Sequence, residues 1–417
     1  IMGELELSGK IRAVKGVHSA CSTAQACGIS RCIVPQGNAD EAREVTGMLV
    51  YGADTLSDAL NALKNPDCFS ASRHVTDEQG LPAGSVLIDG VYFGPVMEGF
   101  EFSELRGQEK LVRALQIAAA GGHNLMAVGA PGCGKTMAVQ KLPALLPLLT
   151  KEEAQSVTRI WSLAGILQPS EPIIRTPPFR MPHSTATLEG LCGGGPQCRP
   201  GEISLAHNGV LFLDEAAEFR TTVLQTLRVP LESSRITLSR AGRSTVYPAN
   251  FQLMLAANPC PCGNYGNKSK ICLCSASAID HYWKKFSAPL LDRVDLRVSV
   301  SNESENGFDE SQKTLSTNEL RRPIAKAVSI QRKRQGCKNA SLTPEQTGSF
   351  CPLNAEVKKT LDKAVVHYGF SPRATASIIK TARTIADMDG SVDIQKNHLD
   401  EAVDFRKVFN NLAFDEF

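Results

Sequence analysis

The sequence predicts an α/β fold, in which a parallel β-sheet flanked by helices is followed by an α-helical lid. Three observations predict it. Short apolar segments that end in glycine or polar residues recur between residues 123 and 259, as buried parallel strands do. Apolar side chains repeat at helical spacing from Ala374 to Ile385. A chain of 417 residues also has room for about two to four domains.

The composition is that of a globular protein, with 42% hydrophobic and 21% charged residues and no apolar run near the ~20 residues that cross a bilayer. We therefore expect a cytoplasmic protein without a membrane segment. Thirteen cysteines is an odd number, which argues against a disulfide framework and favours reduced thiols or a metal site. The net charge of +2 gives no overall attraction to nucleic acid, so DNA binding would need local basic patches.

The first apolar strand leads into a glycine-rich turn and a helix in HNLMAVGAPGCGKTMAVQKL, residues 123–142. The turn fits G-x-x-x-x-G-K-[ST], the P-loop pattern, which predicts a P-loop NTPase core with ATP and Mg²⁺ as cofactors. Lys135 is expected to reach the outer phosphates, and Thr136 to offer its hydroxyl to Mg²⁺. The residues predicted to bind the nucleotide here are Gly129, Ala130, Pro131, Gly132, Cys133, Gly134, Lys135 and Thr136.

Two further strands end in polar residues. GVLFLDEAAEF, residues 209–219, ends in adjacent carboxylates, and parallel sheets place ligands at this end of a strand. Asp214 is predicted to hold Mg²⁺ through water and Glu215 to polarise the attacking water, which indicates ATP hydrolysis. FQLMLAANP, residues 251–259, ends in Asn258, whose amide can orient that water; a simple Asn-Pro turn is the alternative.

Four cysteines follow within NPCPCGNYGNKSKICLCS, residues 258–275. Two C-x-C pairs on opposite ends of a loop suit tetrahedral Zn²⁺, whereas the alternative is a set of free thiols. Any metal there would be structural, because the catalytic ion is the Mg²⁺ held by Thr136 and Asp214. The predicted zinc ligands are Cys260, Cys262, Cys272 and Cys274.

Together these segments resemble the AAA+ ATPases. Three stretches look like the magnesium-chelatase-like branch, and within it the ComM/YifB family of competence-associated ATPases: FRMPHSTATLEGLCGGGPQCRPGEISLAHNGVLFLDE, NPCPCG and SAPLLDRVDL. The resemblance implies an AAA+ core over residues 96–302, a linker over 303–318 and a helical lid over 319–417. It also implies a helix-2 insert at about 186–204 and a pre-sensor hairpin at about 234–250.

The resemblance assigns roles to three more residues. Arg293 in LLDRVDL matches the arginine finger, whose permanently cationic fork suits developing phosphate charge in a neighbouring subunit; a surface salt bridge with Asp292 or Asp295 is the alternative. Arg373 in FSPRATASIIK matches sensor 2 of the lid and is expected to face nucleotide. Gln108 could contribute to binding the adenine. The two arginines imply a closed ring, in this family a homohexamer.

Basic residues in two places are candidates for DNA contact. Arg240 and Arg243 flank the predicted hairpin tip, and in a ring they would meet DNA phosphates in the pore; a solvated tip is the alternative. The basic stretch at residues 321–336 predicts an amphipathic helix whose charged face either contacts DNA or is simply solvated.

Residues 1–66 resemble the second half of the Lon-protease-like, ribosomal S5-like domain: a strand, an alanine-rich helix, a strand over Cys32–Val34 and a helix ending near Leu63. Where the Lon pattern carries its lysine, Gly16–Ala20 contains none, so we expect no proteolysis. Residues 67–95 are predicted to be an inter-domain linker.

The resemblance implies a hexameric ATP-hydrolysing DNA motor, that is, a translocase or helicase. Its expected substrate is branched or single-stranded DNA. It would promote branch migration or remodelling of DNA joints during recombination or natural transformation. An alternative is a chelatase-type ATPase subunit that drives Mg²⁺ insertion into a porphyrin, because a shared fold does not decide function. A third is a non-catalytic protein that binds ATP as a structural ligand, which Glu215 and Arg293 argue against.

Overall fold

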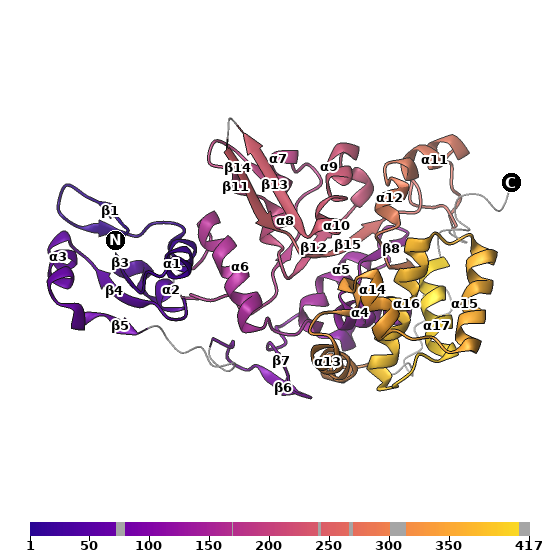
Figure 1. Cartoon of the computed structure of the whole chain (residues 1–417). Helices are drawn as coiled ribbons and strands as arrows, with labels where there is room; N and C mark the ends of the chain where they lie inside the picture. The colour runs from indigo at the N-terminus through magenta and orange to yellow at the C-terminus, as the bar shows by residue number, and fades with distance from the viewer. Residues whose placement is uncertain (72–79, 169, 241–242, 267–269, 301–313, 408–417) are drawn as a thin grey trace.

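The computed structural model describes residues 1–71, 80–168, 170–240, 243–266, 270–300 and 314–407. The chain passes from a small amino-terminal α/β unit, through a central sheet with its helices, to a carboxyl-terminal helical lid (Figure 1). None of the described helices has both the length and the apolar character that a bilayer span requires.

The amino-terminal unit has its own sheet, in the order β3-β4-β5, with β3 and β4 parallel. The expected strand over Cys32–Val34 lies inside β3, and the expected last helix ends at Lys64. The unit docks on helix α6, where the Ser162 hydroxyl donates to a Glu41 carboxylate oxygen at 2.5 Å. Its elements are β1 (Glu4–Leu5), β2 (Ile11–Arg12), α1 (Val17–Ala26), β3 (Arg31–Pro35), α2 (Ala39–Arg43), β4 (Leu49–Ala53), α3 (Leu56–Lys64) and β5 (Ser70–Ala71).

Residues 67–95, predicted to be a linker, contain ordered structure. Strand β5 completes the amino-terminal sheet, and β6 (Val86–Ile88) pairs with β7 (Val91–Phe93) as a hairpin. Phe93 is fully buried, and the backbone N–H of Leu148 donates to the carbonyl of Tyr92. The glycines and prolines that suggested a linker form the turns around these short strands.

The central sheet has five parallel strands in the order β16-β8-β15-β12-β9. Successive side chains point to opposite faces: Leu125 and Ala127 enter the core shared with the lid, whereas Met126 and Val128 enter the core on the other face. Both faces are covered, which explains the continuous apolar runs. The strands are β8 (Leu125–Gly129), β9 (Phe179–Arg180), β12 (Val210–Leu213), β15 (Gln252–Ala257) and β16 (Leu296–Val300).

Helices and two insertions surround this sheet. The predicted insert contains two short helices and a two-stranded ladder, and the predicted pre-sensor hairpin is present as β13 (Arg235–Arg240) and β14 (Arg243–Pro248). The helices of the core are α4 (Glu109–Gly121), α5 (Lys135–Gln140), α6 (Lys151–Ala164), α9 (Thr221–Thr226), α10 (Pro230–Ser233), α11 (Ala276–Lys284) and α12 (Ala288–Leu291). The insert comprises α7 (Leu188–Cys192), β10 (Gly193–Gly194), β11 (Arg199–Pro200) and α8 (Glu202–Leu205).

The lid packs on the core through α13 and α16, which contact α4, and through α17, which contacts β16. Most of the predicted linker at 303–318 lies outside the described residues. Neither alternative for the basic stretch at 321–336 holds for Arg321, which is 1% exposed and donates to the carbonyls of Ala144 (2.7 Å) and Gly94 (2.8 Å). The lid helices are α13 (Thr317–Arg334), α14 (Pro344–Phe350), α15 (Ala355–Tyr368), α16 (Pro372–Asp389) and α17 (Lys396–Lys407).

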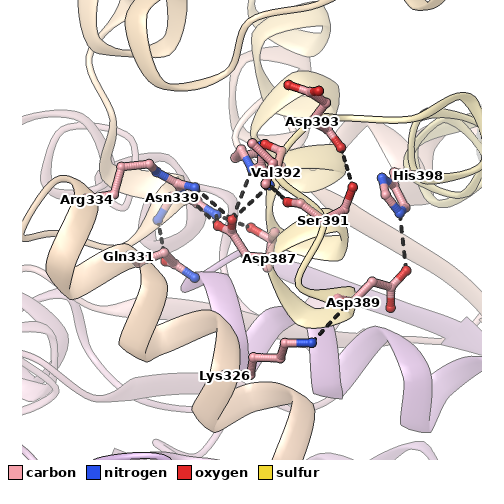
Figure 2. A network of polar contacts seen from close by, with 12 residues as sticks. Lys326, Gln331, Arg334, Asn339, Asp387, Asp389, Ser391, Val392, Asp393 and His398 are labelled. Atoms are coloured by element: carbon pink, nitrogen blue, oxygen red, sulfur yellow. Dashed lines mark hydrogen bonds and ion pairs between the residues drawn. The ribbon is translucent and has the colours of Figure 1, made fainter.

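A buried ionic network joins α13 to α16 (Figure 2). The fully buried Asp387 accepts hydrogen bonds from both terminal nitrogens of Arg334, at 2.7 and 2.8 Å. It also forms an ion pair with Arg383. Asn339 donates to the same carboxylate at 2.8 Å. Arg334 is therefore a structural cation of the lid, because Asp387 binds both of its terminal nitrogens and Gln335 and Asn339 accept from its other N–H groups.

Replacing Asp387 with alanine is expected to destabilise the lid by about 3 to 5 kcal/mol, because the buried Arg383 and the partly buried Arg334 lose their counterion. Chemical unfolding followed by circular dichroism would measure this. Asp389→Ala is the matched control, since the Asp389 side chain is 51% exposed and makes one hydrogen bond with His398, whose loss should cost about 1 kcal/mol. Equal losses in the two variants would contradict the role given to Asp387.

Candidate nucleotide site

Three adjacent strands bring the predicted site residues other than the two arginines together. Strand β15 lies between β8 and β12, and all three are parallel, so their carboxyl ends share one edge of the sheet. Lys135 and Thr136 follow β8, Asp214 follows β12, and Asn258 follows β15. Ligands of open parallel sheets bind at this edge.

The P-loop requires glycine at specific places. Gly129 ends β8 so close to β16 that a Cβ would clash with the carbonyl oxygen of Val300. Gly132 and Gly134 have positive φ values of 80° and 85°, a conformation that glycine adopts without strain. Phosphate-binding loops use such glycines because they let backbone N–H groups approach the phosphates closely.

Lys135 is held inside this loop. Its side chain is 7% exposed, and its ammonium donates to the carbonyls of Gly129 (2.6 Å) and Ala130 (2.8 Å). The amide oxygen of Asn258 lies 3.4 Å from the same nitrogen. The lysine and the asparagine thus meet at the edge where the phosphates of a nucleotide would lie, as the sequence predicts.

Thr136 and Asp214, the two residues predicted to hold Mg²⁺, lie in contact with each other. The threonine hydroxyl donates to a carboxylate oxygen of Asp214 at 2.9 Å, and the backbone N–H of Glu215 donates to the other oxygen at 2.9 Å. Hydroxyl and carboxylate oxygens are hard ligands that suit Mg²⁺. Glu215 is exposed and has a φ of 46°, a left-handed conformation that costs a non-glycine residue about 1 kcal/mol or more. Such strain is common at functional sites.

Gln108 contacts the P-loop itself. It precedes α4, and its amide donates to the carbonyl of Cys133 at 2.7 Å. The side chain therefore supports the loop backbone from the lead-in segment, while its predicted contact with the adenine stays a prediction.

The two predicted arginines lie at the opposite edge of the sheet. Arg293 precedes β16, and the N–H groups of Asp295 and Leu296 donate to the carbonyl of Asn124, which precedes β8. A five-residue strand spans roughly 16 Å, so about this distance separates Arg293 from the P-loop of its own chain. The lid delivers Arg373 to the same edge, where Ser371 donates to Asp292 at 3.4 Å.

Arg293 and Arg373 meet at one carboxylate. Glu232 of α10 lies 2.6 Å from Arg293 and 3.7 Å from Arg373. The salt bridge considered for Arg293 is therefore present, but its partner is neither Asp292 nor Asp295. The sequence contains no signal for this pairing, because Glu232 belongs to no motif and precedes Arg293 by 61 residues.

The four predicted zinc ligands form one cluster. Their sulfur atoms all lie within 4.8 Å of one another, and the distances from Cys260 to Cys262 and Cys272 are 3.4 and 3.7 Å. Tetrahedral zinc with Zn–S bonds of about 2.3 Å separates its sulfurs by about 3.8 Å, so the cluster fits this ion. The backbone N–H of Asn264 and the neighbouring thiols lower the pKa of Cys262 to about 6, which favours the thiolate that binds metal.

The cysteine cluster is packed against the P-loop. Gly263 follows Cys262 with a φ of 76°, and a Cβ there would clash with the ring of Pro131. On the other side of the loop, the Trp283 indole N–H donates to the carbonyl of Pro259 at 3.0 Å. Residues 267–269 of this loop lie outside the described part of the chain.

Arg240 and Arg243, the predicted DNA contacts, face each other in register at the far end of the β13–β14 hairpin, and residues 241–242 between them are not described. The base of the hairpin is anchored, because Ile236 and Tyr247 are buried. The Tyr247 hydroxyl also donates to the carbonyl of Cys198 in the insert, at 2.8 Å. Hairpin and insert are thus joined.

Known proteins resemble the chain over nearly its whole length. Residues 101–308 match the family described as magnesium chelatase, subunit ChlI, and residues 314–406 match the ChlI C-terminal family. The chain is 38% identical to the uncharacterized protein YifB of Escherichia coli over 98% of this chain and 77% of YifB. It is 37% identical to the competence protein ComM of Haemophilus influenzae over 97% of this chain and 77% of ComM. The magnesium-chelatase 38 kDa subunit of Cereibacter sphaeroides is 27% identical over 38% of this chain and 53% of that subunit.

Proposed function

Since the chain belongs to the ComM/YifB family of magnesium-chelatase-like AAA+ proteins, we propose that it is a Mg²⁺-dependent ATPase that works as a hexameric DNA motor and remodels DNA joints. The observation that carries the ATPase part is the convergence of Lys135, Thr136, Asp214 and Asn258 at one sheet edge. Recombination or natural transformation is the proposed setting, because the relative ComM is a competence protein.

Each residue of the site has a role in this reaction. Lys135 would exchange its carbonyl partners for phosphate oxygens, and Thr136 and Asp214 would hold Mg²⁺, which would neutralise phosphate charge. Glu215 polarises the attacking water and takes up its proton, and Asn258 orients that water. Exclusion of bulk water from the closed interface strengthens these interactions.

A ring explains the position of the arginines. Neither Arg293 nor Arg373 lies near the P-loop of its own chain, since a strand length of roughly 16 Å intervenes. Both can serve a nucleotide only across a contact with another copy, which a head-to-tail closed ring supplies. Six copies are proposed from the family.

DNA is the proposed substrate because the hairpin presents Arg240 and Arg243 at its end. Arginines on a projecting hairpin can bind phosphates without regard to sequence, as a translocating motor needs. The amino-terminal unit is proposed to be non-proteolytic. The motif segment Gly16–Ala20 lacks the lysine that a serine–lysine protease needs.

The chelatase alternative is supported by the family match and by the resemblance to the 38 kDa chelatase subunit, which covers 38% of this chain. The testing experiment measures ATP turnover with no addition, with forked or four-way DNA, and with a porphyrin and Mg²⁺. Stimulation by DNA together with strand exchange supports the motor. No binding, stimulation or exchange with DNA would refute it, and porphyrin-dependent turnover would favour the alternative.

We further propose that the cysteine cluster holds one structural Zn²⁺. Protein purified without added metal is expected to contain about one zinc per chain by elemental analysis. Cys260→Ser should lose it, and because the loop packs on Pro131, this variant should also bind ATP more weakly. Cys27→Ser, at an exposed cysteine of the amino-terminal unit, is the control. A metal-free native protein with full activity would contradict this proposal.

A further inference from the structure

We propose that Glu232 is a positioning residue that restrains Arg293 and Arg373, and that the DNA-facing hairpin controls this restraint. The inference rests on the proposed function, since it assigns a regulatory role to the same intersubunit arginines. Glu232 is 61% exposed and makes ion pairs with both arginines, at 2.6 and 3.7 Å. The hydrogen bond from Arg293 holds the pKa of Glu232 below its usual value, so the carboxylate is ionised.

The carboxylate of Glu232 competes with phosphate for the same donors. Arg293 is 8% exposed, and its two terminal nitrogens donate to Glu232 and to the carbonyl of Pro289. Its third nitrogen, Nε, is buried without a hydrogen-bond acceptor among the described residues. Glu232 neutralises the charge of Arg293 and occupies an N–H group of one terminal nitrogen, so its carboxylate competes with a phosphate for a bidentate contact with this arginine.

The backbone connects Glu232 directly to the hairpin. Glu232 lies in α10, which leads through Ser234 directly into β13. Ser234 has a left-handed φ of 53°, and its carbonyl accepts from the N–H of Ala249, which follows β14. This hydrogen bond closes the foot of the hairpin at Ser234, two residues after Glu232. A displacement of the two strands would therefore shift the Glu232 carboxylate.

The segment that carries Arg293 is held by the lid as well as by the core that it shares with the hairpin foot. Lid helix α16 donates from Ser377 to Asp295 at 2.5 Å, and Arg406 of α17 donates to the carbonyls of Asp292 and Val294. The segment that carries Arg293 is therefore fixed to the lid, which also carries Arg373. Glu232 links both arginines to the hairpin foot through its two ion pairs, so engagement of DNA by the hairpin can withdraw Glu232 and free both arginines for the neighbouring nucleotide.

The test is steady-state ATP hydrolysis by the full chain, with and without four-way DNA. Glu232→Gln is expected to raise the DNA-free kcat by about three- to tenfold, the loss expected of two partly exposed ion pairs, with KM for ATP unchanged. The ratio of DNA-stimulated to DNA-free rates should fall by the same factor. Glu232→Asp keeps the charge but is one methylene shorter, and should give an intermediate rate. Glu356→Gln, at an exposed position of α15, should match the native protein.

An unchanged or lower DNA-free kcat in Glu232→Gln, in protein that melts and assembles like the native chain, would overturn the inference. A merely structural role predicts a lower melting temperature without faster hydrolysis. If DNA does not stimulate the native protein, the motor proposal fails and the link to the hairpin fails with it. The DNA-free rate of Glu232→Gln then still decides whether Glu232 restrains the arginines.

Discussion

Removal of the Arg293 guanidinium, by an Arg293→Ala substitution, is expected to lower the rate of ATP hydrolysis by about three to five orders of magnitude, the range measured for arginine fingers. ATP binding should persist, because Arg293 lies at the sheet edge opposite to the P-loop. Phosphate release and binding of a fluorescent ATP analogue would separate the two effects. Arg332→Ala, at an exposed arginine of α13, is the matched control and should leave hydrolysis unchanged.

A mixing experiment shows whether Arg293 acts on its neighbour. Lys135→Ala chains lack a working P-loop but keep the finger, whereas Arg293→Ala chains have the reverse defect. In a randomly mixed ring, about one site in four combines the intact P-loop of an Arg293→Ala chain with the intact arginine finger of an adjacent Lys135→Ala chain. Two inactive variants should therefore recover about a quarter of the native rate when mixed and reassembled. Failure to recover activity in mixed rings would contradict action between subunits.

The Glu215→Gln substitution is expected to lower kcat by about two to four orders of magnitude, which is the usual contribution of a general base. Glutamine keeps the shape of the side chain but cannot take up a proton. The magnesium pair of Thr136 and Asp214 does not involve the Glu215 carboxylate, so affinity for ATP should stay near the native value. Rapid-quench measurement of a single turnover would show slow chemistry after normal binding.

Glu218→Gln provides the comparison for Glu215→Gln. Glu218 is also exposed and lies three residues further along, beyond the strand end, so its amide variant should hydrolyse ATP within about twofold of the native rate. Equal rates in the two variants would remove the assignment of Glu215 as the base.

The nucleotide site could be predicted because its chemistry is encoded locally. The spacing of Gly129, Gly134, Lys135 and Thr136 sets the chain path of the P-loop, and the apolar runs before Asp214 and Asn258 identify buried strands. Parallel strands bring their ends to one edge, so the convergence of these residues follows from the pattern. The cysteine cluster was predictable for the same reason, since its ligands lie within one short segment.

The predictions for residues 67–95 and for the basic stretch differ from the structure where long-range packing decides. Phe93 is buried by contacts with segments that are distant in the sequence. From the sequence alone, short strands separated by polar turns have the same composition as an inter-domain linker. Arg321 and Arg334 are spaced like a solvated helix face, yet backbone carbonyls and Asp387 bind them. Charge patterns identify a cation but not its partner.

The sequence by itself determined the family, the α/β core, the chemistry of the P-loop edge and the four-cysteine segment. Each of these depends either on residues that are close along the chain or on the parallel arrangement of the strands. Only the tertiary structure decided that Arg293 and Arg373 lie at the far edge of the sheet and share Glu232. That arrangement depends on where three segments distant in sequence are brought together by the lid and the hairpin foot. The physical reason is that short-range spacing specifies local conformation, whereas the partner of a charge is set by the path of the whole chain.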